Sequence, residues 1–540
     1  MKGFRSLLFP LLSLSLFFSS CLGNAPRISS IDPRIGTMGE VLTIHGSGFG
    51  KTRSENRVTL AGIAPTASSY IEWTPDRIAV RIPDFGESGL VYVYASGKKS
   101  NAALFTNRAS MPLLVSETDA GSVPRVLSVE PAAAKIGSLL TISGRNFGAS
   151  RENSSVLFAW DADINTQTAS VARAPDSLEV SDLELGYEYW SDRELRVRVP
   201  DGASTGNLLI KTARGTSIPV FFERVDSPGN KVFKEKRSYA INFSVDVKVA
   251  RASGPNTLYL WVPRPTTAPS QRNIQLLSRS MEPFVEGHRG ASLYQLKDLS
   301  ETSNANIALS YLVDVYAIST QVKPQSIKKD PNSPVRASYT IATPLIPSDN
   351  KDIIKTAEKI VGKERNPYVQ ARKVYDWLLR NGFIGLRGQA GGAVKALEIE
   401  KADAYSAALL FCALSRSLDI PAIPVSGFLV DKNRSTKRHF WAEFWIDGFG
   451  WIPVDPALGA GATPEGFIAR PDAREFYFGN LDNQRVTFSR NFSILSPMDP
   501  RGRVAERDRA YALQTLWEEA VGGLESYSSL WSDLTVTGVY

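Results

Sequence analysis

Cysteine and histidine are scarce in this chain of 540 residues, which has two of the first and three of the second. Cys21 lies in the N-terminal leader, so Cys412 is the only cysteine in the rest of the chain, and one cysteine cannot form an intramolecular disulfide. Its apolar surroundings, ALLFCAL, favour a buried small side chain. His45, His288 and His439 are isolated in the sequence, which excludes a zinc-type cluster. No Gly-rich phosphate loop is present either, so we expect no cofactor and no metal.

Long apolar runs and a strong charge of one sign are also missing. Beyond the leader, no stretch is long and apolar enough to cross a bilayer. The formal net charge is +7, and removing Lys2 and Arg5 with the leader leaves +5. Because this excess is small and the charges are interspersed, the composition does not predict binding to nucleic acid. Apolar residues make up 43% of the chain, which is typical of ordinary folded domains.

The leader predicts export. Lys2 and Arg5 precede an apolar run from Leu7 to Phe18, which is too short for a membrane span but suits a signal peptide over residues 1–20. The following FSSC resembles a bacterial lipobox, in which Cys21 would be acylated. We therefore expect an exported protein anchored by its N-terminal lipid in the bacterial cell envelope, on the periplasmic face or the cell surface. Ordinary cleavage beside an incidental cysteine is the alternative.

The first half of the chain contains a repeat. Residues 26–50 and 124–148 are identical at 11 of 25 positions, and the later phrases VRIPD and VRVPD recur in the same order. Short alternating segments separated by Gly and Pro predict strands. The pattern resembles the IPT/TIG family of immunoglobulin-like sandwiches, over residues 25–108 and 123–224. Neither unit has a cysteine pair, so each sandwich must depend on its apolar core.

The second repeat is 19 residues longer between its two blocks, since the offsets are 98 and 117. The extra residues fall around 161–188 and are rich in carboxylates: Asp161, Asp163, Asp176, Glu179, Asp182, Glu184 and Glu188. A calcium site or a basic partner is conceivable. Because the spacing is not that of a calcium loop, we favour a solvated acidic loop.

A third β domain is predicted over residues 231–345. Apolar residues alternate strictly from Tyr239 to Val249, which indicates a half-buried strand. Helical texture begins near Asp352, where an α+β domain is expected over residues 350–500. Residues 501–540 are expected to add a helix of about Glu506 to Ala520 and a terminal strand, TVTGVY. The fold class is therefore multidomain, with two sandwiches, a third β domain and an α+β core.

Residues 401–459 carry the most specific motifs. They read KADAYSAALLFCALSRSLDIPAIPVSG, then HFWAEFW, then GWIPVDPALG. This order resembles the transglutaminase-like superfamily, a papain-like Cys-His-Asp fold. The resemblance assigns the family's histidine to His439 and its aspartate to Asp455. The cysteine would open the preceding helix, where this chain has Asp403 as a cap and Ala404 as the first residue. Without a thiol there, the acyl-transfer chemistry implied by the resemblance has no nucleophile.

Two other residues near the helix start could in principle replace the nucleophile, but their positions are unfavourable. Ser406 is expected about 200° round the helix from the catalytic position, and Cys412 about 12 Å along its axis. Tyr405, Trp441 and Trp451 could line a cleft, although the tryptophans are better explained as core and rim packing.

The hairpin after His439 makes a specific prediction. A symmetric turn of residues 447–450 would place Asp455 on the strand face away from His439. A one-residue bulge, which Gly448 and Gly450 permit, would return Asp455 to the same face. We predict this bulge and a contact between Asp455 and His439.

The sequence favours an inactive transglutaminase-like domain that binds a protein, a peptide or a cell-wall fragment. One alternative is an active cysteine protease or amidase that uses an unforeseen nucleophile. Another is a structural or adhesive surface protein that binds through its sandwiches.

Overall fold

The computed structural model describes residues 25–37, 39–83, 88–107, 123–161, 177–380, 383–385, 391–507 and 510–540. The chain divides into two compact units, residues 1–118 and 119–540. Cys21 lies outside the described residues. In the part of the chain described, no helix combines the length and the hydropathy needed to span a bilayer.

The first unit is a β-sandwich, as the repeat predicted. One sheet has the order β1-β3-β6-β5 and the other β2-β9-β7-β4, with β8 beside β7. The strands are β1 (Arg27–Asp32), β2 (Ile35–Gly36), β3 (Val41–Ser47), β4 (Arg57–Leu60), β5 (Tyr70–Trp73), β6 (Arg77–Arg81), β7 (Gly89–Ala95), β8 (Lys98–Lys99) and β9 (Ala103–Asn107). Alternating side chains such as Leu42 and Ile44 on β3 are buried between the sheets.

A second sandwich begins the second unit and repeats this order. Its sheets are β10-β12-β16-β15 and β11-β19-β17-β13-β14, with β18 beside β17. The strands are β10 (Arg125–Glu130), β11 (Ala133–Ala134), β12 (Leu139–Arg145), β13 (Ser155–Ala159), β14 (Ser177–Glu179), β15 (Tyr187–Trp190), β16 (Glu194–Arg198), β17 (Gly206–Thr212), β18 (Gly215–Thr216) and β19 (Val220–Arg224). At Gly144 an added Cβ would lie 2.2 Å from the carbonyl oxygen of Arg125, which explains the recurring glycine.

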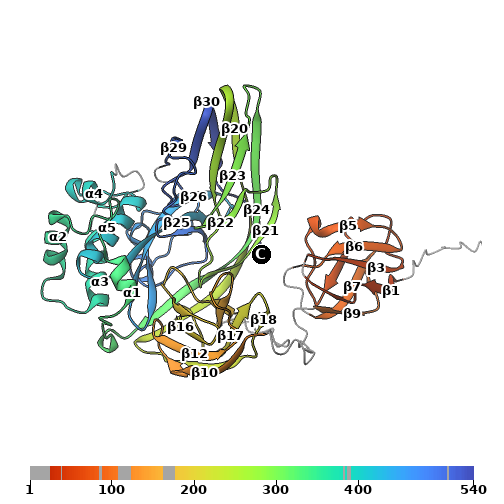
Figure 1. Cartoon of the computed structure of the whole chain (residues 1–540), viewed down its shortest axis with the longest axis horizontal. Helices are drawn as coiled ribbons and strands as arrows, with labels where there is room; N and C mark the ends of the chain where they lie inside the picture. Colours follow the sequence, from red (N-terminus) through yellow and green to blue (C-terminus); the bar gives the residue numbers. More distant parts are fainter. Residues whose placement is uncertain are drawn as a thin grey trace, which may run out of the picture. The chain divides into compact units, whose positions relative to one another are not determined.

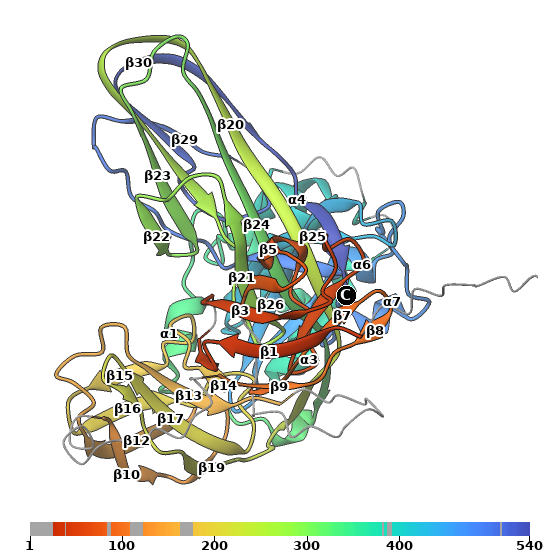
Figure 2. The ribbon, with the colours of Figure 1, turned by 90° about the vertical axis from the view of Figure 1, so that its right-hand side faces the viewer.

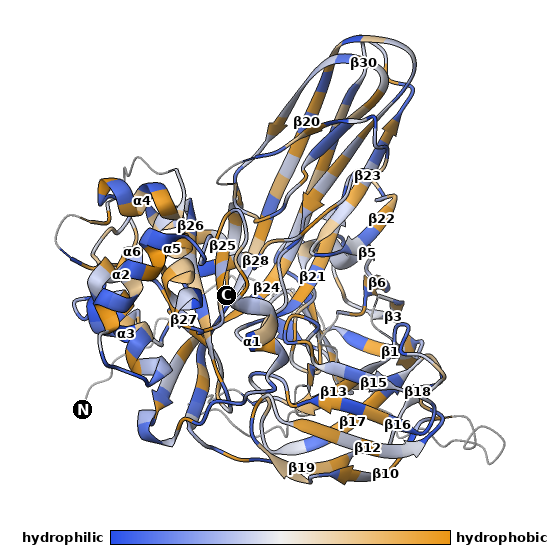
Figure 3. Cartoon of the chain, turned by 60° about the vertical axis from the view of Figure 1, so that its left-hand side comes forward, coloured by the Kyte–Doolittle hydropathy of each residue, from blue (hydrophilic) through white to orange (hydrophobic). Residues whose placement is uncertain are grey.

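A long twisted sheet follows, built on the predicted alternation. It joins β20 (Gly229–Pro263), β21 (Gln271–Arg279), β22 (Val285–His288), β23 (Ala291–Lys297) and β24 (Asn304–Val322) in the order β21-β24-β20-β23-β22. Figures 1 and 2 show β20, β23 and β30 side by side, and the hydropathy of β20 alternates along its length in Figure 3. The alternate residues from Tyr239 to Val249 are buried in one core.

The end of the chain completes this sheet. It forms β29 (Arg503–Ala505), β30 (Glu518–Trp531) and β31 (Thr535–Val539), and both β30 and β31 pair with β20. The predicted terminal strand is therefore confirmed. The predicted helix over 506–520 is wrong: the described residues of this segment form no helix, and Glu518 already belongs to β30.

The α+β core contains a sheet of order β27-β26-β25-β28 with helices packed against it. The strands are β25 (Ala422–Val430), β26 (Thr436–Ile446), β27 (Gly450–Val454) and β28 (Arg485–Arg490). The helices are α1 (Pro334–Tyr339), α2 (Lys351–Val361), α3 (Pro367–Leu378), α4 (Ala393–Ile399), α5 (Ala404–Ser417), α6 (Pro456–Gly459) and α7 (Ala473–Phe476). Asn366 caps α3, and Asp403 caps α5 as the sequence predicted. The buried α5 contacts β26, which fixes the helix start relative to the hairpin strand.

Candidate functional site

The β26–β27 hairpin brings His439 and Asp455 together. Trp445 pairs with Trp451 and Ile446 with Gly450, which leaves a three-residue turn over 447–449. His439 Nε2 lies 2.8 Å from Asp455 Oδ2, so the predicted contact is present. The predicted bulge is absent, because the ladder is regular and the turn is one residue shorter than the symmetric turn considered from sequence. The shorter turn changes the register by one residue and so has the effect expected of the bulge.

Asp455 is fully buried and held from three sides. Besides His439, its Oδ2 accepts a hydrogen bond from Arg485 Nη1 at 3.1 Å, and its Oδ1 accepts one from the backbone N–H of Leu458 at 3.0 Å. Burial would raise the pKa of Asp455, but His439 and then Arg485 outweigh it, and the pKa lies below its ordinary value. Asp455 is therefore ionised, and it orients the imidazole through Nε2.

Arg485 is a site residue that the sequence reasoning missed. Its guanidinium also binds Asp482, with Nη2 2.8 Å from Oδ2, and lies over the ring of Trp441 at 4.8 Å. Tyr477 donates to the same Asp482 carboxylate. The phrase LDNQRVTFS contains these two charges at a spacing of three, but nothing local in the sequence connects them to Asp455, 30 residues away.

The start of α5 faces the same region. Asp403 Oδ1 accepts a hydrogen bond from the backbone N–H of Ser406 at 2.9 Å, and Ala404 is the first helical residue. This is the position where unpaired N–H groups and the helix dipole would stabilise a thiolate. The methyl group of Ala404 instead packs with Ala408 and Phe440.

A cavity of about 180 Å³ joins the two elements. Its lining residues come from the start of α5, from β26 and from the loop after α6: Gly385, Asp403, Ala404, Tyr405, Arg438, His439, Phe440, Ala457, Ala462 and Pro464. The structure thus brings Asp403, Ala404 and Tyr405 to one cavity with His439. It does not bring Trp441 or Trp451 there, because both side chains are buried in the core. The interpretation favoured from the sequence, packing in the core, therefore holds for both tryptophans, and the alternative that they line this cleft does not.

None of the described residues that line this cavity is Cys, Ser or Thr. Ser406 and Cys412 are fully buried and lie outside it. Burial raises the pKa of Cys412 to about 12, so its thiol is neutral and unreactive at neutral pH. The described residues also contain no group of three or more His, Cys, Asp or Glu placed to hold a metal ion.

Comparisons with known proteins agree with this architecture. Residues 354–456 match the transglutaminase-like superfamily, and residues 26–107 and 124–168 match the IPT/TIG domain. The chain therefore contains two IPT/TIG domains followed by a transglutaminase-like domain, the class that the sequence motifs predicted.

Individual relatives are distant. An uncharacterized protein of Haemophilus influenzae is 26% identical over 258 residues, which are 41% of this chain and 68% of that protein. The solved structure named as a putative cysteine protease from Cytophaga hutchinsonii is 17% identical with a TM-score of 0.37, and covers 58% of this chain and 92% of that one. SGBP-B from a complex xyloglucan utilization locus in Bacteroides uniformis is 12% identical with a TM-score of 0.14, over 55% and 100% of the two chains. At these TM-scores, the two structural likenesses carry no argument about function.

Proposed function

We propose that the transglutaminase-like domain is a non-catalytic binding module, which holds a peptide or an amide side chain in the His439 cavity without turning it over. One observation carries the proposal: an oriented His439–Asp455 pair shares a cavity with Ala404, where the resemblance expects a nucleophilic thiol. Acyl transfer needs a nucleophile as well as the base that activates it.

The cavity retains hydrogen-bonding groups for a ligand. In the tautomer that donates a hydrogen bond from His439 Nε2 to the Asp455 carboxylate, Nδ1 is a hydrogen-bond acceptor. Nδ1 makes no hydrogen bond with any described residue. Arg438 and Tyr405 add polar groups to the wall. This set suits a primary amide, which can donate to Nδ1 while its carbonyl oxygen accepts.

Two measurements test the proposal. Amine incorporation and peptide cleavage are expected to be absent in the full chain. Activity that disappears in His439→Ala would contradict the proposal and favour the active-enzyme alternative.

The second measurement introduces a cysteine at residue 404, where the resemblance expects the nucleophile. Ala404→Cys is expected to react with iodoacetamide at neutral pH at least about tenfold faster than the double variant Ala404→Cys, His439→Ala, because the helix start and the imidazole stabilise a thiolate. The unsubstituted chain, with buried Cys412, supplies the background. Equal rates in the two variants would show that residue 404 does not face His439.

We also propose that Cys21 carries a lipid that anchors the exported chain. The support is the short apolar leader followed by FSSC. Cys21→Ser is expected to move the protein from the membrane fraction to the soluble fraction and to abolish labelling by a palmitate analogue, whereas Cys412→Ser changes neither. Retention of the label in Cys21→Ser would contradict the assignment.

A second candidate function is adhesion through the two sandwiches. Leu104 on β9 and Phe221 on β19 occupy equivalent places in the repeat, and their side chains are 65% and 63% exposed. Because both repeats keep an exposed apolar side chain at this position, it is the place to test for a contact surface on the sandwiches. Peptide binding that survives His439→Ala and is lost in the double variant Leu104→Ser, Phe221→Ser would favour this candidate.

A further inference from the structure

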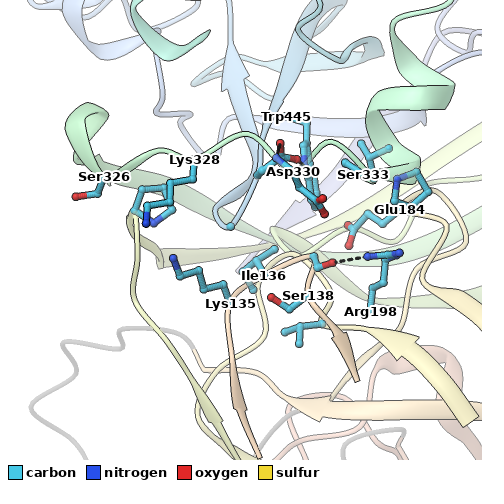
Figure 4. A pocket seen from close by; sticks show the side chains of 17 residues that line it. Lys135, Ile136, Ser138, Glu184, Arg198, Ser326, Lys328, Asp330, Ser333 and Trp445 are labelled. Carbon is cyan, nitrogen blue, oxygen red and sulfur yellow. Dashed lines mark hydrogen bonds between the residues drawn. The ribbon is translucent and has the colours of Figure 1, made fainter. Parts of the chain in front are cut away.

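A second polar cavity lies within the unit of residues 119–540, away from His439. It is formed where the loop 135–138 of the second sandwich, the segment 326–335 and the β26–β27 turn meet (Figure 4). Ile136 and Gly448 form a β-bridge at its floor, so the loop and the turn are held together by backbone hydrogen bonding. Its volume of about 150 Å³ equals that of an engineered protein cavity that accepts benzene, a molecule of six heavy atoms.

Glu184 provides one charged wall. The residue is only 4% exposed, and its Oε2 accepts a single hydrogen bond, from the backbone N–H of Asp201 at 2.8 Å. Its Oε1 accepts no hydrogen bond from any described residue, and Figure 4 shows the carboxyl group directed into the cavity. This oxygen can accept a further hydrogen bond, and a bound cationic N–H group would donate one.

The opposite wall is basic. In Figure 4, Lys135 and Lys328 lie together on the side of the cavity away from Glu184. Neither ammonium group forms an ion pair or a hydrogen bond with a described residue. Arg198 differs, because its Nη1 donates to the carbonyl oxygen of Gly137 and its Nη2 to Glu188. Lys135 and the exposed Lys328 on one side and the buried Glu184 on the other therefore define a polar axis across the cavity. Asp330 and Asp447 also line it, and Asp447 is already paired with Arg336 and Trp445.

We propose that this cavity binds a compact zwitterion of the α-amino acid class, with its ammonium group on Glu184 and its carboxylate between Lys135 and Lys328. Each simpler ligand fits only half of the site. An anion alone makes no contact with Glu184, a cation alone makes none with the two lysines, and an apolar molecule pairs with neither wall. The small volume restricts the ligand to about six to eight heavy atoms.

The charge state of Glu184 adds a second signature. Burial and then the charge of Asp201 raise the pKa of Glu184 to about 7, while the Asp201 backbone hydrogen bond, Arg490 and Lys231 act in the opposite direction. An ammonium group binds the ionised form. Ligand binding is therefore expected to release a proton near pH 6, and affinity is expected to rise between pH 6 and pH 8.

Isothermal titration of the full chain tests the site with L-alanine, propionate and ethylamine, of which the last two each lack one charge of the first. L-alanine is expected to bind, and each analogue at least about tenfold more weakly, because a charged hydrogen bond is lost. Equal binding of propionate or of ethylamine would overturn the proposal and show a simple anion or cation site. No binding of L-alanine by the unsubstituted chain would also overturn it.

Variants then assign the two walls. Glu184→Gln, which conserves shape, is expected to weaken L-alanine binding about tenfold or more and to remove its pH dependence. Lys135→Ala and Lys328→Ala are each expected to weaken binding without changing that pH dependence. Glu358→Gln and Lys359→Ala, exposed on α2, serve as matched controls and should bind as the unsubstituted chain does. Unchanged affinity in a Glu184→Gln protein with a normal thermal transition would contradict the assignment.

Discussion

The two sandwiches have the same internal contacts but differ in their loops. In the first, Tyr70 Oη accepts a hydrogen bond from the backbone N–H of Val58 at 2.9 Å, and Trp73 Nε1 donates to the carbonyl oxygen of Phe49 at 3.0 Å. In the second, Tyr187, Val156, Trp190 and Phe147 form the same two bonds at 3.1 Å. The shared core therefore depends on the repeated residues.

The second sandwich additionally contributes charged groups to the rest of its unit. Its Asp201 forms a buried ion pair with Lys231 of β20, at 2.6 Å, and Lys231 also donates to the carbonyl oxygen of Trp451. Glu184, from the longer loop, faces the second polar cavity, which Figure 4 shows. The comparison indicates that the repeat encodes the sandwich, whereas the insertion and the loops encode its contacts within residues 119–540.

Removing the central aromatic ring should have the largest effect and test whether the two cores are equivalent. Phe49 and Phe147 are fully buried at matched positions. We expect Phe49→Ala and Phe147→Ala each to lower the free energy of unfolding by about 3–5 kcal/mol, through lost burial and the cavity left behind. Hydrogen exchange followed by mass spectrometry would measure each unit separately.

The two phenylalanine substitutions should accelerate hydrogen exchange in different parts of the chain. Phe49→Ala should accelerate exchange only within residues 1–118, and Phe147→Ala only within residues 119–540, because these are separate compact units. The exposed Leu104→Ala is a control that should change stability by less than about 0.5 kcal/mol. Loss of protection in both units from one substitution would contradict their independence.

The parts of the fold predicted well from sequence are those with local or repeated signals. The repeat predicted both sandwiches, the strict alternation predicted much of β20, and Asp403 predicted the start of α5. His439 and Asp455 were found because their motifs are each local, and the hairpin between them is short. Arg485 was missed because its contact with Asp455 depends on the pairing of β28 with β25, which no local pattern specifies.

One wrong helix and one unexpectedly buried carboxylate both depend on contacts that are distant in the sequence. Residues 506–520 are rich in helix formers, but Ala520 and Glu518 pair with Leu258 and Leu260 of β20, so long-range pairing overrides local propensity. The acidic segment around residues 161–188 was predicted to be a solvated loop, and Asp161, Glu179, Asp182 and Glu188 are exposed. Glu184 is instead buried, while Asp163 and Asp176 lie outside the described residues. Composition could not distinguish one buried carboxylate from its exposed neighbours.

Glu184 should make the free energy of unfolding depend on pH, with a smaller effect than that of the phenylalanine substitutions. Burial raises the pKa of Glu184 from an ordinary 4.5 to about 7. Between these pH values Glu184 is therefore protonated in the folded state and ionised in the unfolded state. The free energy of unfolding should therefore decrease as pH rises from about 4.5 to 7, by at most about 3 kcal/mol, and then level off.

Denaturant unfolding at several pH values, with Glu184→Gln as the comparison, would measure this contribution. The variant should lose the decrease and be the more stable protein at pH 8, while Glu358→Gln on α2 should follow the unsubstituted chain. A pH dependence of Glu184→Gln identical to that of the unsubstituted chain would show that another group is responsible.

The smallest expected effect is also the closest test of equivalence. Tyr70→Phe and Tyr187→Phe each remove one hydroxyl acceptor and leave Val58 or Val156 without its side-chain partner, at a cost of about 1 kcal/mol. Arg53 and Arg151 stack on the two rings, but among the described residues only Arg151 of the two also forms an ion pair, with Asp182 of the longer loop. If the insertion serves the contacts of the sandwich and not its core, the two losses should agree within about 0.5 kcal/mol in denaturant unfolding. A much larger loss for Tyr187→Phe would show that the insertion has become part of the second core.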